Sequence, residues 1–182
     1  ATNGVGPRRR LFGASRDMVI GMTYATLDGE LAQSGGIVVK NVAGLDVQKT
    51  LIGSFGTLAA ITSINFKLAP LPEATRTFVL TFGSAAEAAA ARDTVLQGVL
   101  QPAALDILNA HAAAELQLSG HCLLLRAGGS SALLNRYSKE LPQAQVLEAD
   151  GEMNLWRRVG DFCPAHDFVI RIGHALSELA AV

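Results

Sequence analysis

Two neighbouring stretches carry the most specific pattern of the sequence, Gly35-Gly36-Ile37-Val38-Val39-Lys40-Asn41-Val42-Ala43-Gly44-Leu45-Asp46 and Gly53-Ser54-Phe55-Gly56-Thr57-Leu58-Ala59-Ala60-Ile61-Thr62. Between them, Asp46 is placed to N-cap a short helix over 47–52, because its carboxylate can accept hydrogen bonds from the free N–H groups of a first turn. The second stretch therefore begins at a helix end and continues into residues typical of a β-strand. We expect a helix, a glycine-bearing turn and a strand in that order.

The turn 53–57 admits two interpretations. Two glycines three residues apart let backbone N–H groups approach an anion without an intervening Cβ, and Ser54 and Thr57 add hydroxyl donors, so phosphate or pyrophosphate is a natural ligand. Alternatively, the glycines supply only the positive φ of a tight helix-to-strand turn. The spacing favours neither interpretation, and it matches neither GxGxxG nor GxxxxGK[ST].

The chain opens with a second glycine-bearing stretch that is rich in hydrogen-bond donors, Ala1-Thr2-Asn3-Gly4-Val5-Gly6-Pro7. By itself this stretch favours a surface loop. The arginines at 8–10 are more typical of a solvated rim than of a binding patch.

Proline and glycine divide the chain into two parts. Residues 1–70 predict mostly strands and loops, with a hairpin at Asp28-Gly29 whose two turn positions both need positive φ. The segment 69–72 holds two prolines and is the best boundary. Residues 73–182 alternate strands with helices, the expected strands being 75–82, 104–108, 121–126, 145–148 and 168–172, and the expected helix caps being Ser84, Ser131 and Asp150. This alternation predicts an α+β domain with helices on one face of its sheet.

Composition narrows the function classes. Of the 182 residues, 15 are Lys or Arg and 16 are Asp or Glu, a balance that does not favour nucleic acid or anionic lipid as a partner. Polar residues interrupt every apolar run before the ~20 residues of a membrane span. Cys122 and Cys163 form no CxxC pair, which disfavours zinc modules and disulfide scaffolds and suits a reducing compartment. A cytoplasmic protein is expected.

No catalytic side chain stands out. The histidines share no metal-ligand spacing, and neither a GxSxG nor a flanked cysteine nucleophile is present. We therefore expect no metal site and assign no catalytic residue. Redox chemistry, if any, would have to come from an organic cofactor.

The two opening stretches resemble the pattern GG…VKNVAGYD followed by GSxGTLGVIT, which occurs in FAD-binding domains of the vanillyl-alcohol oxidase and p-cresol methylhydroxylase (PCMH) flavoproteins. Within that family they look most like the E subunits of bacterial glycolate oxidases. The resemblance covers residues 1–72. Residues 73–182 match the family only by their position after the FAD-binding domain and by their alternation of strands and helices. It implies the C-terminal portion of a PCMH-type FAD-binding domain at 1–70 and a ferredoxin-like α+β cap domain, on the substrate side, at 73–182.

The resemblance also implies a non-covalent FAD site. The opening loop would contact the phosphates or ring system of FAD, Ile61 would give it backbone hydrogen bonds, and Gly53 and Gly56 would shape the adjacent loop. The implied cofactor-binding residues are Ala1, Thr2, Asn3, Gly4, Val5, Gly53, Gly56 and Ile61. Lys40 and Asn41 belong to the motif without an assigned contact.

Three departures from the family pattern matter. Leu45 stands where relatives usually have Tyr, and Ala59 stands where they usually have Gly. The methyl of Ala59 would either be tolerated or displace the cofactor. The subdomain that carries the main pyrophosphate loop in the family would precede Ala1, so we expect this chain to be the C-terminal part of a longer protein. The H-x-x-D-G-N-x-H string of the catalytic relatives is also missing, as the resemblance to E subunits implies.

The implied function is that of an FAD-binding subunit in a glycolate or 2-hydroxy-acid oxidase (dehydrogenase) complex. Such an FAD-dependent oxidoreductase acts on CH–OH groups, and this chain would contribute flavin binding and contacts to the other subunits. The chain would be cytoplasmic, or it would be held at the periphery of the inner membrane by the other subunits. The alternative is a truncated FAD-fold interaction module that binds no flavin by itself and serves assembly. In either case exposed apolar surface predicts self-association.

Overall fold

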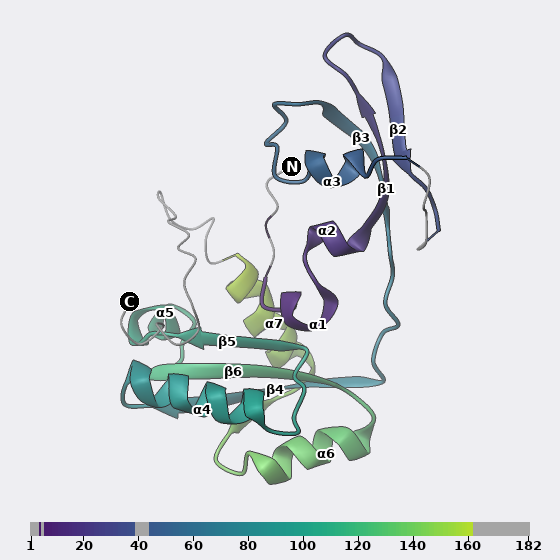
Figure 1. Cartoon of the computed structure of the whole chain (residues 1–182). Helices are drawn as coiled ribbons and strands as arrows, with labels where there is room; N and C mark the ends of the chain where they lie inside the picture. The colour runs from purple at the N-terminus through teal and green to yellow at the C-terminus, as the bar shows by residue number, and fades with distance from the viewer. Residues whose placement is uncertain (1–3, 5, 39–43, 162–182) are drawn as a thin grey trace. The chain divides into compact units, whose positions relative to one another are not determined.

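The structure is a computed structural model of the chain, and it describes residues 4, 6–38 and 44–161. The chain divides into two compact units, residues 1–71 and 72–182, and each is described by itself (Figure 1). The division falls inside the proline-bearing segment 69–72. The strand expected at 168–172 and Cys163 lie outside the described residues.

The first unit is a three-stranded antiparallel sheet with short helices. Its strand order is β2-β1-β3. Its elements are α1 (Arg9–Phe12), α2 (Ser15–Met18), β1 (Val19–Ala25), β2 (Leu31–Gly35), α3 (Val47–Leu51) and β3 (Ala60–Phe66). The sequence predicted α3 and these strands but missed α1 and α2, which are single turns of four residues. The β-branched residues at 37–39 predict a short strand, but Ile37 and Val38 lie in a bend.

The β1–β2 hairpin lies where the sequence predicted it, but its turn type was predicted wrongly. Gly29 has a φ of 85°, whereas Asp28 is not among the residues with positive φ. The Gly29 N–H donates to the Thr26 carbonyl at 3.0 Å, and the Thr26 N–H donates to the Glu30 carbonyl at 2.9 Å. The loop is therefore a three-residue turn that closes on a left-handed glycine.

A small core holds α3 against one face of this sheet. It consists of the buried residues Val19, Met22, Leu51 and Ala59. At the end of β2 the two strands approach so closely that a Cβ on Gly35 would lie 2.3 Å from the Ile20 carbonyl oxygen. The first glycine of the Gly35-Gly36 pair is thus required by this backbone approach and by its own φ of 75°.

The second unit has the strand order β5-β6-β4-β7, with every neighbouring pair antiparallel. Its elements are β4 (Ala74–Phe82), α4 (Ala85–Gln97), β5 (Ala104–Leu108), α5 (Ala110–Glu115), β6 (His121–Gly129), α6 (Ser131–Glu140), β7 (Gln145–Leu147) and α7 (Ala149–Gly160). Without α5 and α7, this is the βαββαβ order of a ferredoxin-like domain. The predicted α+β class is confirmed.

The expectation that the helices would cover one face of the sheet was wrong. Alternate residues of β4 and β6 belong to two different buried clusters, as Leu123 and Leu125 pack in one and Cys122 and Leu124 in the other. Helices α4 and α6 contribute to the first cluster, and α5 and α7 contribute to the second (Figure 1). The apolar run 122–125 carried this information, because a strand buried on both faces reads as a continuous apolar run.

Helix caps agree with the sequence in part. The Ser84 Oγ accepts the Glu87 N–H at 3.2 Å, as predicted. At α6 the cap is Ser130 instead of Ser131, its Oγ accepting the Leu133 N–H at 3.4 Å. Helix α7 begins one residue before Asp150 and has no side-chain cap.

Candidate functional site

Helix α3 positions the candidate loop, and polar side chains anchor this helix to β2. The Asp46 side chain does not cap the helix, contrary to expectation. Its carboxylate accepts from Gln48 Nε2 at 3.0 Å and from Lys49 Nζ at 2.5 Å. Gln48 is buried, and its Oε1 accepts from the Ser34 hydroxyl of β2 at 2.5 Å. Hydrogen bonds from Lys49 and then Gln48 hold the pKa of Asp46 below its usual range.

The turn between α3 and β3 bends tightly through left-handed positions. Gly53, Phe55 and Gly56 have φ values of 88°, 54° and 83°. The Thr57 N–H and hydroxyl both donate to the Ser54 carbonyl, at 2.9 and 2.7 Å. The positive φ of the two glycines is what the turn interpretation of this sequence required.

One polar atom of this turn is not accounted for by the turn itself. The Ser54 Oγ is buried and has no hydrogen-bond partner within the described part of the chain. A buried hydroxyl without a partner costs roughly 1–3 kcal/mol. Such an atom is typical of a place where a ligand or water completes the hydrogen bonding.

Strand β3 follows the turn and forms one edge of the sheet. Ile61 lies opposite Tyr24 of β1 and is half-buried. Because β3 has one neighbour in the described sheet, alternate backbone N–H and C=O groups along it point away from β1. Ala59 is 4% exposed and its methyl packs in the core with Leu51, so this departure from the family glycine is accommodated inside the protein.

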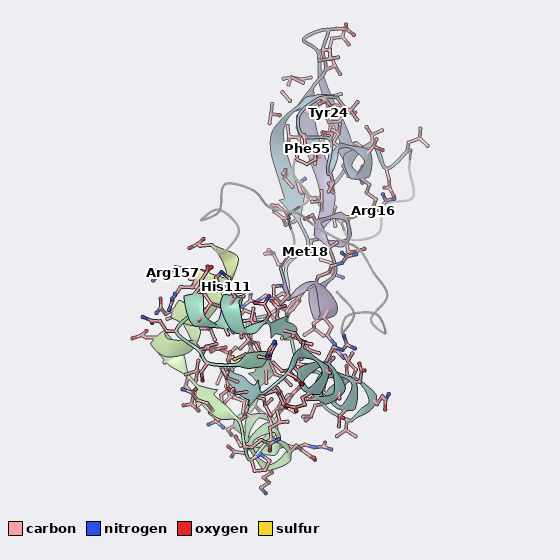
Figure 2. All side chains as sticks on the ribbon, turned by 90° about the vertical axis from the view of Figure 1, so that its left-hand side faces the viewer. Arg16, Met18, Tyr24, Phe55, His111 and Arg157 are labelled. Atoms are coloured by element: carbon pink, nitrogen blue, oxygen red, sulfur yellow. The ribbon has the colours of Figure 1, made fainter. Side chains whose placement is uncertain are left out.

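The structure brings three of the expected cofactor residues, Gly53, Gly56 and Ile61, onto one turn and the strand that follows it. Gly4 is exposed in irregular backbone. Ala1, Thr2, Asn3 and Val5 lie outside the described residues, as do Lys40 and Asn41. Phe55, labelled in Figure 2, is 71% exposed at the tip of the turn.

Sequence reasoning did not single out a charged hollow of about 300 Å³ in the first unit. Its polar walls are Arg16 and Asp17 of α2, Asp46, Gln48 and Lys49 at α3, and Lys67 just after β3. A signal was present in the sequence: residues 1–71 hold seven Lys and Arg against four Asp and Glu, while residues 72–182 hold eight against twelve. The near-zero charge of the whole chain concealed this asymmetry.

The second unit has a buried polar network where α7 meets the sheet. Glu152 is 1% exposed, and it accepts from Arg126 Nε at 2.8 Å and from the hydroxyls of Thr75 and Thr77 at 2.5 and 3.2 Å. Trp156 Nε1 donates to the Thr77 hydroxyl at 2.7 Å. Every member of this network has a partner, so it serves to fix α7 on the sheet.

Two other titratable groups of this unit are desolvated. Burial raises the pKa of Asp106 to about 6, against the lowering effect of a hydrogen bond from the Ile107 N–H. Burial also raises the pKa of the Cys122 thiol, which makes that cysteine an inert core residue.

Residues 4, 6–38 and 44–161 contain no cluster of three or more His, Cys, Asp or Glu able to hold a metal ion. Among the helices in those ranges, none has the length and apolarity to cross a membrane.

Comparison with known sequences finds relatives among oxidoreductases. The chain is 33% identical to the glycolate oxidase subunit GlcD of Bacillus subtilis over 107 residues, which are 59% of this chain and 23% of that protein. It is 44% identical to the glycolate oxidase subunit GlcE of Escherichia coli over 69 residues, 38% of this chain and 20% of that protein. An uncharacterized FAD-linked oxidoreductase of Mycobacterium tuberculosis strain H37Rv is 31% identical over 108 residues, 59% of this chain and 24% of that protein.

The matched stretch thus spans about a quarter or less of the length of these relatives. No protein-family model matches the chain.

Comparison with solved structures concerns the fold. A solved structure of alkyldihydroxyacetonephosphate synthase aligns with a TM-score of 0.66 and 18% identity. The alignment covers 89% of this chain and 36% of the synthase chain. The structure of p-cresol methylhydroxylase with substrate bound aligns with a TM-score of 0.57 and 13% identity. The alignment covers 85% of this chain and 39% of the hydroxylase chain. The predicted PCMH-type fold is confirmed. The chain is a homologue of the glycolate oxidase subunits and of FAD-linked oxidoreductases, and it has the fold of the PCMH-type FAD-binding proteins.

Proposed function

We propose that this chain is part of an FAD-dependent oxidoreductase of small 2-hydroxy acids and supplies cofactor binding and subunit contacts in a glycolate oxidase-type complex. The relatives named above are glycolate oxidase subunits and an FAD-linked oxidoreductase. In this proposal residues 1–70 are the C-terminal portion of the FAD-binding domain, and residues 73–182 are the substrate-side cap.

The observation that carries the proposal is the turn 53–57 beside the edge strand β3. Gly53, Phe55 and Gly56 hold left-handed φ values, and Ser54 offers a buried hydroxyl without a partner in the described residues. The N–H groups of Ser54 and Thr57 donate within the turn, so the Ser54 hydroxyl is the donor left for a ligand. Such a group fits a ligand rich in hydrogen-bond acceptors, and the diphosphate and ring carbonyls of FAD are acceptors of this kind.

Each part of the site would have a separate role. The Ser54 hydroxyl would donate to the cofactor. Backbone N–H and C=O groups of β3 that point away from β1 would orient it, and we propose that those of Ile61 are among them. The opening loop 1–5 would complete the contacts. Bound FAD would supply the redox chemistry by accepting a hydride from the hydroxyl-bearing carbon of the substrate.

The test is a visible absorbance scan of the purified chain before and after addition of FAD and desalting. Retained flavin bands that diminish in Ser54→Ala, and persist in the control Ser131→Ala on the exposed start of α6, would support the proposal. Flavin bands that remain equal in both variants would contradict the assignment of Ser54.

A second candidate function rests on exposed apolar side chains of the first unit. Phe55 on the turn is 71% exposed, Leu58 just after it is 52% exposed, and Leu68 after β3 is 86% exposed. Apolar surface of this kind favours association with another protein surface. A chain that retains no flavin but associates with itself or with partner subunits would be the assembly module instead.

A further inference from the structure

We propose that the charged hollow of the first unit, between α2, α3 and the end of β3, binds a phosphate-class anion through Arg16 and Lys67. This inference goes beyond the proposed function, because the hollow is formed by other residues than the turn 53–57 and the opening loop. Its ligand is either a free phosphate or diphosphate ion or the diphosphate of a nucleotide. The chemistry that recognises both is the same.

The hollow has the size and the wall chemistry that such a ligand needs. Its volume is about 300 Å³, which accommodates a diphosphate with some of its water. Arg16, Lys49 and Lys67 reach it from three separate segments, and Val19 and Val38 form an apolar wall. Arg16 and Lys67 are exposed, and three cations that converge on one hollow attract an anion more strongly than isolated surface charges do.

The carboxylates at the hollow do not neutralise all three cations. Asp46 pairs with Lys49 at 2.5 Å. Asp17 accepts the Ala14 N–H at 2.7 Å, which ties that carboxylate to the start of α2. Within the residues that the structure describes, neither Arg16 nor Lys67 forms an ion pair within 4.0 Å. The charge of Arg16 makes only the smallest contribution to the lowered pKa of Asp46, so Arg16 and Lys67 are the cations of the hollow without a short ion pair in the described residues.

The backbone brings the two residues close to each other. The Lys67 N–H donates to the Met18 carbonyl at 2.7 Å, so the end of β3 is fixed beside the end of α2. Arg16 lies on the same helix two residues before Met18, as Figure 2 shows for the two labelled residues. An arginine fork and a lysine ammonium fixed at neighbouring backbone positions suit the oxygens of one phosphate group.

The test titrates the full chain, labelled with ¹⁵N, with sodium pyrophosphate and follows amide chemical shifts. Saturable shifts at residues 16–20, 46–49 and 67 are expected. Arg16→Gln and Lys67→Gln should each weaken binding about tenfold, because each removes a charge-assisted hydrogen bond. The matched controls are Arg157→Gln and Lys139→Gln, exposed cations of the second unit, and they should leave binding within about twofold.

Two further measurements distinguish a nucleotide from a free anion as the ligand, and they separate this inference from the proposed function. If ADP and FAD compete with pyrophosphate for the same shifts, the ligand is a nucleotide diphosphate; if pyrophosphate still binds to the FAD-loaded chain, it is a free anion. Absence of saturable binding at millimolar pyrophosphate, shifts confined to residues 53–57, or equal binding by the variants would overturn the inference. Flavin retention is read separately by absorbance, so a chain that binds pyrophosphate and no flavin would refute the proposed function alone.

Discussion

The Thr57 hydroxyl donates to the Ser54 carbonyl at 2.7 Å, while the Ser54 hydroxyl on the same residue is buried without a partner in the described structure. The turn therefore satisfies its own backbone and leaves one side-chain donor unused. A turn that served only to reverse the chain would gain stability by having alanine at this position.

Ser54→Ala should change stability and flavin binding in opposite directions. Removal of an unpartnered buried hydroxyl should leave the flavin-free chain unchanged or raise its free energy of unfolding by up to about 1 kcal/mol. The same substitution should weaken FAD binding about threefold to tenfold, because one hydrogen bond to the cofactor is lost. Urea unfolding and FAD titration measure the two quantities. A variant that loses stability and keeps its FAD affinity would contradict the role given to Ser54.

Gly35→Ala should destabilise the first unit more than Gly29→Ala does. Both glycines have positive φ, 75° and 85°, so both substitutions carry a backbone strain of about 1 kcal/mol. Only at Gly35 would the new Cβ meet backbone, the Ile20 carbonyl oxygen at 2.3 Å, whereas at Gly29 nothing lies within 4 Å. The additional overpacking should cost about 1–3 kcal/mol. Equal losses for the two variants in thermal unfolding would show that β1 and β2 are not so closely apposed.

Glu152→Gln should strongly destabilise the second unit. It removes the charge that faces Arg126, whose side chain is 12% exposed, and the expected loss is about 3–5 kcal/mol. The control is Glu140→Gln, because Glu140 and Arg136 form an exposed pair at 3.9 Å that should contribute less than about 1 kcal/mol. The double variant Glu152→Met with Arg126→Met should recover much of the loss, since it leaves no buried charge. A single variant as stable as the control would argue against the network that fixes α7.

Asp106 should make the chain less stable as the pH rises. Burial raises the pKa of Asp106 from 3.8 to about 6, so the folded state binds its proton more tightly than the unfolded state does. The resulting destabilisation is absent below pH 3.8, grows between pH 3.8 and 6, and is complete above that, reaching about 3 kcal/mol at most. Asp106→Asn should therefore be stabilising at neutral pH and nearly neutral in effect at acidic pH. Urea unfolding at several pH values, with the exposed Glu73→Gln as control, measures this; a pH-independent difference would refute it.

The sequence predicted the fold best where local chemistry and tertiary packing agree. The strand over Ala74–Phe82, the cap at Ser84 and the hairpin at Gly29 follow from patterns that act within a few residues. The single-turn helices α1 and α2 carry too few residues for a periodic signal. Asp46 was assigned as a cap because it precedes a helix, but the ammonium of Lys49 competes successfully for its carboxylate.

The candidate site could be predicted only in outline. The spacing of Gly53 and Gly56 indicated a turn with positive φ, which the structure shows. The unpartnered hydroxyl of Ser54 depends on what packs around it, and no sequence pattern reports that. The hollow at Arg16 and Lys67 joins residues fifty-one positions apart, so it forms only when β3 is paired with β1.

Whether this chain holds FAD is decided by a visible absorbance scan of the full chain after incubation with FAD and desalting. We expect retained flavin bands, with a loss of bound flavin in Ser54→Ala and none in Ser131→Ala. A correctly folded chain that passes through desalting without any flavin absorbance would contradict the claim that this chain holds the cofactor.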